Sequence, residues 1–140
     1  MKPQQVLRTA LIDTYRQHGW EIPNSVIDYE SELFSLYIDK PDFEPKPSYA
    51  EQYMTMNTVS EARRLADCCF FTRSVFPDLK QHRGISSSYF VDMGQGCYDR
   101  VYKETGYAVM LLMRDHFEFL AECAYTAIRM NGEFRSMWED

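Results

Sequence analysis

RGISSSYFVDMGQGCYDRVY, residues 83–102, is the stretch that decides the fold, because it combines a helix start with an apolar face and two glycines. The serine hydroxyls of residues 86–88 can accept hydrogen bonds from the unpaired amides of a first helical turn. At about 100° per residue, the apolar side chains that follow fall on one broad arc and the polar side chains fall opposite. The stretch therefore predicts a helix with one buried side.

The two glycines of this helix differ in their expected roles. Gly94 projects into the middle of the apolar arc, where a helical glycine costs about 1 kcal/mol relative to alanine. We therefore expect another element to pass close to the backbone there, within the core or at an interface. Gly96 lies near the polar edge, where the sequence offers no packing reason for a glycine, so it is a candidate contact for a subunit or ligand. Phosphate-binding glycines precede a helix, whereas these lie inside one, which disfavours a nucleotide site.

The rest of the chain follows the same helical periodicity and has no convincing alternating strand pattern. With proline, glycine and capping residues as boundaries, it predicts helices over residues 4–18, 24–40, 48–57, 59–76 and 107–130. The third and fourth of these could instead be one bent helix. Residues 41–47, PDFEPKP, predict a stiff connector, which Phe43 attaches to the body. We expect one all-α domain over residues 1–140, a compact bundle of five to six helices without a significant sheet.

Composition and charge exclude several classes of protein. The formal net charge of −6 argues against general affinity for nucleic acid or anionic lipid. The longest apolar run, residues 107–113, is too short to span a bilayer, and the start lacks the apolar core of a signal peptide. We therefore expect a cytoplasmic protein with neither a nucleic-acid nor a membrane partner.

The four cysteines lie inside apolar helical patterns, at positions 68, 69, 97 and 123, without the paired short spacing of a zinc site. They are interpreted as small buried hydrophobic residues. No metal or other cofactor is predicted, and no catalytic residue can be assigned. Any metal held by His116 would need partners from other helices, such as Cys97.

Several short blocks resemble those of uncharacterised bacterial helical proteins without an assigned activity. The blocks are Leu65-Ala66-Asp67, Phe70-Phe71, Phe76-Pro77, residues 86–89, and Met93-Gly94 continuing to Tyr98. They cover roughly the middle third of the chain. The resemblance implies a bacterial source, and it implies nothing about chemistry.

His116 is the most interesting ionisable residue, because its helical angle places it on the apolar side of the last predicted helix. We expect it to be substantially buried. It could act as an axial ligand or proton shuttle, but a neutral core imidazole with a hydrogen-bond partner is the favoured interpretation. The nearby acids Asp115, Glu118 and Glu122 are interpreted as a solvated stripe, since the Glu-x-x-His element of a carboxylate metal site is missing.

Arg73 falls within the apolar arc of the fourth predicted helix. It could hold a buried carboxylate or a ligand anion. The favoured alternative is that it extends toward solvent near the helix end, where it complements the helix dipole.

A surplus of aromatic and methionine side chains favours an interaction surface or a pocket. In the tail, residues 133–140, Phe134, Met137 and Trp138 recur at one-turn spacing, as in an amphipathic docking segment. In addition, residues 26–51 hold seven acids against two lysines, and residues 63–83 hold five basic residues against two acids. This asymmetry suits docking between complementary surfaces or self-association.

Two hypotheses about function follow. The first is a non-enzymatic helical binding or regulatory protein, a homodimer or partner of another protein, that uses an aromatic and methionine surface near the glycine-bearing helix. The second is a pocket protein or enzyme that binds a small apolar or anionic ligand. Its polar groups would be His116 and Arg73, with Tyr98 or Tyr102 as supporting hydrogen-bond donors.

Overall fold

The computed structural model describes residues 3–38, 43–46, 48–77 and 87–130. All regular elements within these ranges are helices, which confirms the predicted all-α class. They are α1 (Pro3–Gln17), α2 (Asn24–Tyr37), α3 (Tyr49–Thr55), α4 (Val59–Val75), α5 (Ser87–Thr105), α6 (Ala108–Asp115) and α7 (Phe117–Met130). The count of seven among the described residues exceeds the predicted five to six, because the last predicted helix is two helices.

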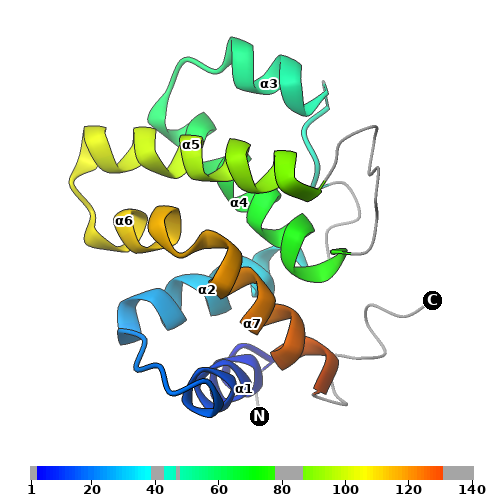
Figure 1. The fold of residues 1–140 in the computed structure, drawn as a ribbon. Coiled ribbons are helices and arrows are strands. Elements are labelled where there is room, and N and C mark those ends of the chain that lie inside the picture. Colours follow the sequence, from blue (N-terminus) through cyan, green and yellow to red (C-terminus); the bar gives the residue numbers. More distant parts are fainter. Residues whose placement is uncertain (1–2, 39–42, 47, 78–86, 131–140) are drawn as a thin grey trace.

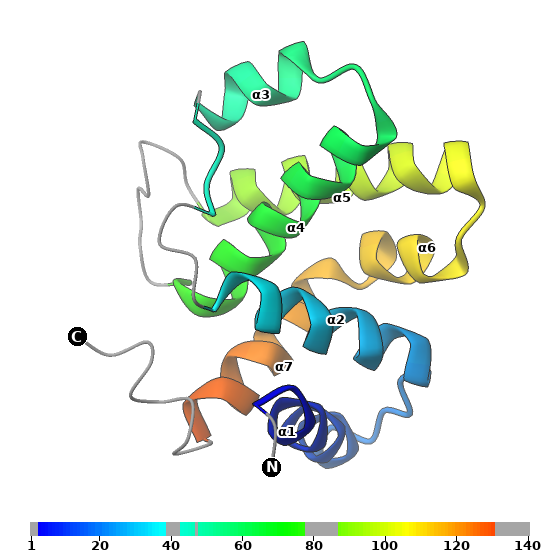
Figure 2. The same ribbon diagram turned by 180° about the vertical axis from the view of Figure 1, so that it is seen from behind.

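The helices are arranged around α4, α5 and α7. Figures 1 and 2 show α3 at one end of the molecule and α1 at the other. The most extensive packing joins α4 to α5, while α6 follows α5 and α7 lies against both α1 and α4. Helices α2 and α4 also contact each other, so the described part of the acidic segment meets the described part of the basic segment at this helix pair.

Glycines end two of the helices as the sequence predicts. Gly19 has φ +74° and follows α1, and its N–H donates to the Arg16 carbonyl at 2.9 Å. The Trp20 N–H donates to the Tyr15 carbonyl at 3.0 Å, which completes a Schellman motif. Gly106 has φ +71° and ends α5 in the same left-handed conformation.

Helices α3 and α4 are separate rather than one bent helix. The Ser48 hydroxyl accepts a hydrogen bond from the Glu51 N–H at 3.1 Å, and the Thr58 hydroxyl accepts one from the Glu61 N–H at 3.1 Å. Thr58 is extended, with φ −116° and ψ 156°, so the chain turns there. Each helix therefore begins at its own capping residue, as the two capping patterns indicate.

The connector is attached to the body through Phe43, as predicted. Phe43 is buried, and its ring lies 4.7 Å from that of Phe71 in an edge-to-face arrangement. Its carbonyl accepts a hydrogen bond from the Cys68 thiol at 3.1 Å. Cys68 and the other three cysteines are buried and carry no disulfide, which confirms their interpretation as core residues.

At Gly94, α5 approaches both α4 and α7 closely. A Cβ at this position would overlap the Phe117 ring, with Cζ at 2.5 Å, and would lie 3.2 Å from the Cys69 Cβ. Phe117 in turn meets the Phe70 ring edge-to-face at 5.3 Å. The close approach expected from the sequence is therefore confirmed, and it lies inside the core.

Candidate functional sites

Arg73 pairs with α7 rather than with a ligand. Its guanidinium Nη2 lies 3.7 Å from the Glu118 carboxylate and 3.6 Å from the Glu122 carboxylate. The Arg73 side chain is 10% exposed, while both glutamates are 62% exposed. Arg73 therefore links α4 to the acidic stripe of α7, and this stripe is solvated as expected.

His116 lies at the junction of α6 and α7, where the sequence predicts a continuous helix. Its backbone leaves helical geometry at φ −116° and ψ 22°, although its N–H still donates to the Leu112 carbonyl at 3.0 Å. The side chain is half-buried, so it is partly enclosed as expected but is not a core residue. The chain changes direction at this residue, so that α6 follows α5 while α7 crosses α4.

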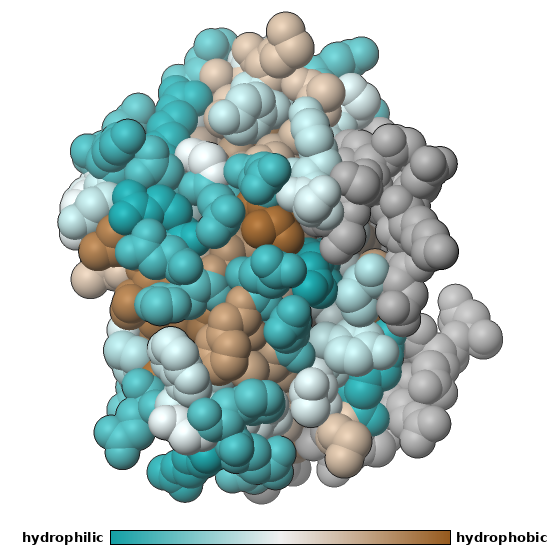
Figure 3. Space-filling view, in the orientation of Figure 1, coloured by the Kyte–Doolittle hydropathy of each residue, from teal (hydrophilic) through white to brown (hydrophobic). Residues whose placement is uncertain are grey.

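The His116 ring belongs to an aromatic cluster at the surface. The Trp20 ring lies 5.5 Å from the His116 ring and 4.7 Å from the Phe119 ring. Val109 and Leu112 precede His116 on one row of α6, and both side chains are half-buried. We call Trp20, Val109, Leu112, His116 and Phe119 the α6–α7 surface. Figure 3 shows hydrophobic colouring along α6 and over part of α7, within a largely hydrophilic face.

The Tyr98 hydroxyl, which the sequence nominates as a donor to a ligand, donates instead to an acid of the protein. The Tyr98 and Tyr29 hydroxyls both donate to Asp67 Oδ1, at 2.7 Å and 2.5 Å. The Arg63 Nε–H donates to the Tyr29 hydroxyl at 3.2 Å. Burial raises the pKa of Asp67 to about 6, while both hydroxyls and Arg63 act in the opposite direction. This cluster joins α2, α4 and α5, and no described residue donates to the other Asp67 oxygen.

A second buried carboxyl group lies between α1 and α2. Glu30 is fully buried, and its Oε1 accepts a hydrogen bond from the Tyr15 hydroxyl at 2.5 Å. Its Oε2 has no hydrogen-bond partner among the described residues. Burial raises the pKa of Glu30 to about 8, so the group is mostly protonated at neutral pH. Neither Asp67 nor Glu30 could be found from spacing, since each acid resembles a surface residue in its own helix.

Tyr102 lies beneath an arginine and is half-buried. The Arg114 guanidinium carbon is 5.7 Å from the centre of the Tyr102 ring. Arg114 also binds Asp99 at 2.6 Å and Asp115 at 2.7 Å. Tyr102 therefore packs within the α5–α6 contact and is separate from the Tyr98 cluster.

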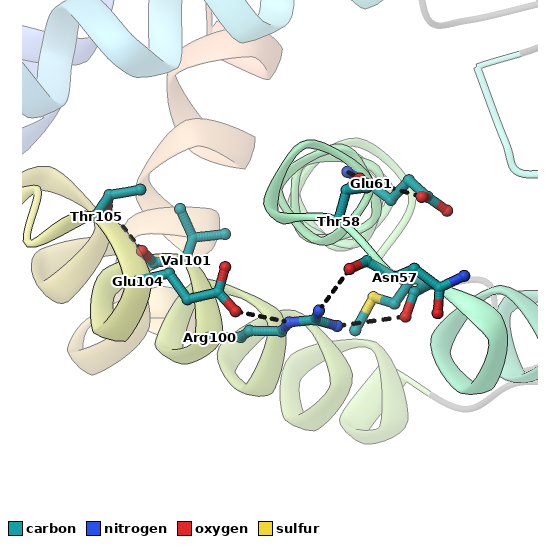
Figure 4. Close-up of polar contacts among 8 residues, drawn as sticks. Asn57, Thr58, Glu61, Arg100, Val101, Glu104 and Thr105 are labelled. Atoms are coloured by element: carbon teal, nitrogen blue, oxygen red, sulfur yellow. Dashed lines mark hydrogen bonds and ion pairs between the residues drawn. The ribbon is translucent and has the colours of Figure 1, made fainter.

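Gly96 has a packing role that the sequence does not reveal. A Cβ there would lie 3.2 Å from the Tyr53 hydroxyl of α3. One turn later, Arg100 donates to the carbonyls of Met56 at 3.4 Å and Asn57 at 3.1 Å (Figure 4). Arg100 also pairs with Glu104 at 3.5 Å. Arg100 thus holds the outlying α3 segment against α5, while Gly96 leaves room for the Tyr53 side chain.

The predicted ligand-binding residues line neither of two pockets that are formed by described residues. The first, of about 240 Å³, is lined by Ile12, Tyr15, Arg16, Trp20, Glu21, Ile22, Asn24 and Ile27. The second, of about 370 Å³, is lined by Glu44, Pro45, Lys46, Gln52, Glu61, Arg64, Leu65 and Cys68. His116 and Arg73 therefore share neither pocket, as the pocket hypothesis would require.

Three further points concern the described residues. They contain no group of three histidine, cysteine or acidic side chains placed to hold a metal ion. None of their helices combines the length and hydrophobicity needed to cross a membrane. The predicted docking residues Phe134, Met137 and Trp138 lie outside the described ranges.

Comparisons with protein-family models, with curated proteins and with solved structures find no match to this chain. The resemblance to bacterial helical proteins therefore stays a prediction.

Proposed function

We propose that the protein is a helical binding protein that acts by self-association rather than by catalysis, and that two copies pair through the α6–α7 surface. The observation that carries this proposal is the exposed Trp20 ring, which is 41% accessible while it packs against Phe119 and meets His116 edge-to-face. Large aromatic side chains that are partly exposed and held in place by neighbours are typical of interface centres.

The surroundings of the α6–α7 surface favour a second copy over a strongly charged partner. Arg16 and Glu21 lie close to Trp20, both are exposed, and no described residue forms an ion pair with either. A two-fold interface brings the same patch of each copy together, so it requires a self-complementary surface. A rim that carries both charge signs meets this requirement, because the basic side chain of one copy can face the acidic side chain of the other.

Light scattering coupled to size-exclusion chromatography tests the proposal directly. The wild-type protein should have twice the monomer mass at high micromolar concentration, and Trp20→Glu should return it to a monomer, because it puts a charge at the centre of the interface. Leu112→Glu is a second variant in the same surface.

Met54→Glu is the matched control, since Met54 is 81% exposed but lies on α3, away from the α6–α7 surface. It should leave the dimer intact. A cooperative thermal transition in each variant checks that the fold survives. A wild-type protein that stays monomeric would contradict the proposal, and so would equal effects of Trp20→Glu and Met54→Glu.

A further inference from the structure

We propose that the 370 Å³ pocket between the connector, α3 and α4 binds a small monocarboxylate with a short apolar body. Figure 2 shows residues 43–46 of the connector on the same side of the molecule as α3 and α4. The site lies apart from the α6–α7 surface and does not depend on self-association. It also uses different residues from the ligand site that the sequence favours.

The two acids of the pocket are already occupied by the protein's own donors. Glu44 Oε2 accepts a hydrogen bond from the Tyr49 hydroxyl at 2.9 Å. Glu61 Oε1 accepts one from the Thr58 hydroxyl at 3.1 Å, and Glu61 Oε2 accepts a longer one from the Gln52 amide at 3.5 Å. The carboxylates are therefore held in place and partly compensated.

The two cations of the pocket have no such partners. Lys46 and Arg64 are both exposed, and neither forms an ion pair or a hydrogen bond with a described residue. A guanidinium offers paired donors that match the two oxygens of a carboxylate, and an ammonium adds a second positive charge. The donors left over in this pocket are thus suited to an anion.

The shape and polarity of the anionic group, rather than its charge, favour a carboxylate. A phosphate, with a charge near −2, doubles the attraction to Lys46 and Arg64 but also doubles the repulsion from Glu44 and Glu61. A carboxylate has two coplanar oxygens that match the paired donors of the Arg64 guanidinium, and it can carry an apolar chain. A monocarboxylate therefore uses both the cations and the apolar part of the pocket, which inorganic phosphate cannot do.

The floor of the pocket is apolar, which predicts an apolar body on the ligand. Leu65 and Cys68 are almost fully buried, and Pro45 forms part of the wall. The Cys68 thiol donates to the Phe43 carbonyl, and burial raises its pKa to about 12, so it stays protonated. It contributes apolar surface rather than a nucleophile. The volume lies near the lower end for small-molecule sites, which favours a short chain.

Titration of the ¹⁵N-labelled full chain with hexanoate tests the proposal. Amide shifts should move in residues 61–68 and around Lys46, with saturation below about 10 mM. The variant that combines Lys46→Gln with Arg64→Gln should lose about tenfold or more in affinity, because both charge-assisted contacts disappear. Lys103→Gln, which removes an exposed cation on α5 outside this pocket and outside the α6–α7 surface, should bind hexanoate as the wild type does.

Two further probes separate the parts of the ligand. Hexanol carries the apolar body without the charge, and inorganic phosphate carries the charge without the body. Both should bind about tenfold more weakly than hexanoate, or not detectably. The proposal is overturned if hexanoate produces no saturating shifts, if the double variant binds it as tightly as Lys103→Gln does, or if either probe binds as tightly as hexanoate. Because the readout does not depend on mass, its failure is distinct from the absence of a dimer.

Discussion

At the scale of single residues, the two glycines of α5 offer a matched pair of substitutions. Gly94→Ala would place a methyl group against the Phe117 ring and close to Cys69, inside the core. We expect a loss of about 1–3 kcal/mol in the free energy of unfolding, because overpacking exceeds the gain in helix propensity. Gly96→Ala would meet only the hydroxyl end of the exposed Tyr53 side chain, which can move. It should be neutral or stabilising by up to about 1 kcal/mol.

Urea denaturation of the two variants measures this difference. Equal stability of Gly94→Ala and Gly96→Ala would refute the contrast between a core contact and a movable surface contact. An unchanged midpoint for Gly94→Ala would remove the close-contact argument for α5 altogether.

Single residues also mark where reasoning from the sequence succeeds and where it ends. Gly94 could be predicted, because a glycine in the middle of an apolar arc has a local cost that only packing explains. Asp67 and Glu30 could not, because their partners Tyr29, Tyr98 and Tyr15 come from other helices or lie far away in sequence. Periodicity assigns a face to a side chain but does not assign its partner.

At the scale of helices, the outlying α3 is held to α5 by few contacts, and Arg100 supplies two of them through the Met56 and Asn57 carbonyls. Arg100→Gln should therefore release α3 locally. We expect amide hydrogen exchange in residues 50–56 to accelerate about tenfold, while the global free energy of unfolding changes by less than about 1 kcal/mol.

Arg100→Lys separates the shape of the side chain from its charge. A lysine keeps the charge near Glu104 but cannot place forked donors on two carbonyls. It should therefore accelerate exchange nearly as much as Arg100→Gln does. If the amides of α3 exchange at the wild-type rate in the lysine variant, then the charge of residue 100 alone holds α3, and the two donors of the guanidinium group have no role.

The helix boundaries follow the same division between local and distant causes. The ends at Gly19 and Gly106 and the start at Thr58 were predictable, because each depends on the conformational preference or side chain of one residue. The break at His116 has no such signal, since neither proline nor glycine lies near it. It follows from α6 and α7 packing against different helices, which the local sequence does not encode.

At the scale of the whole molecule, periodicity predicted the all-helical architecture correctly. It did not identify the pocket that we propose as a ligand site. His116 and Arg73 lie on apolar faces of their own helices, and the structure gives them Trp20 and the α7 glutamates as partners. The pocket with Lys46 and Arg64 combines residues of the connector and α4 that resemble ordinary surface positions in the sequence. Its cations stand out only once the hydrogen bonds of the neighbouring acids are known.

The two buried carboxyl groups predict the pH dependence of stability for the molecule as a whole. Burial raises the pKa of Glu30 from 4.5 to about 8 and that of Asp67 from 3.8 to about 6. Between pH 3.8 and about pH 8 the folded state therefore binds more protons than the unfolded state. The free energy of unfolding is thus greatest at the low end of this range and falls as pH rises. Below pH 3.8 the opposite effect begins, because Asp99, whose pKa is lowered by Lys103 and Arg114, loses its ion pairs. The thermal midpoint should therefore peak at about pH 4–5.

Glu30→Gln isolates the larger part of this dependence. Glutamine keeps an acceptor for the Tyr15 hydroxyl and cannot ionise, so the variant should match the wild type near pH 4.5 and exceed it at pH 9. The shift of Glu30 alone corresponds to at most about 5 kcal/mol, since one pKa unit is about 1.4 kcal/mol. Thermal scans of both proteins from pH 4 to pH 9 measure the divergence. Parallel curves would mean that Glu30 ionises in the folded protein as it does in water. The interpretation of Glu30 as a fully buried, neutral carboxyl group would then be wrong.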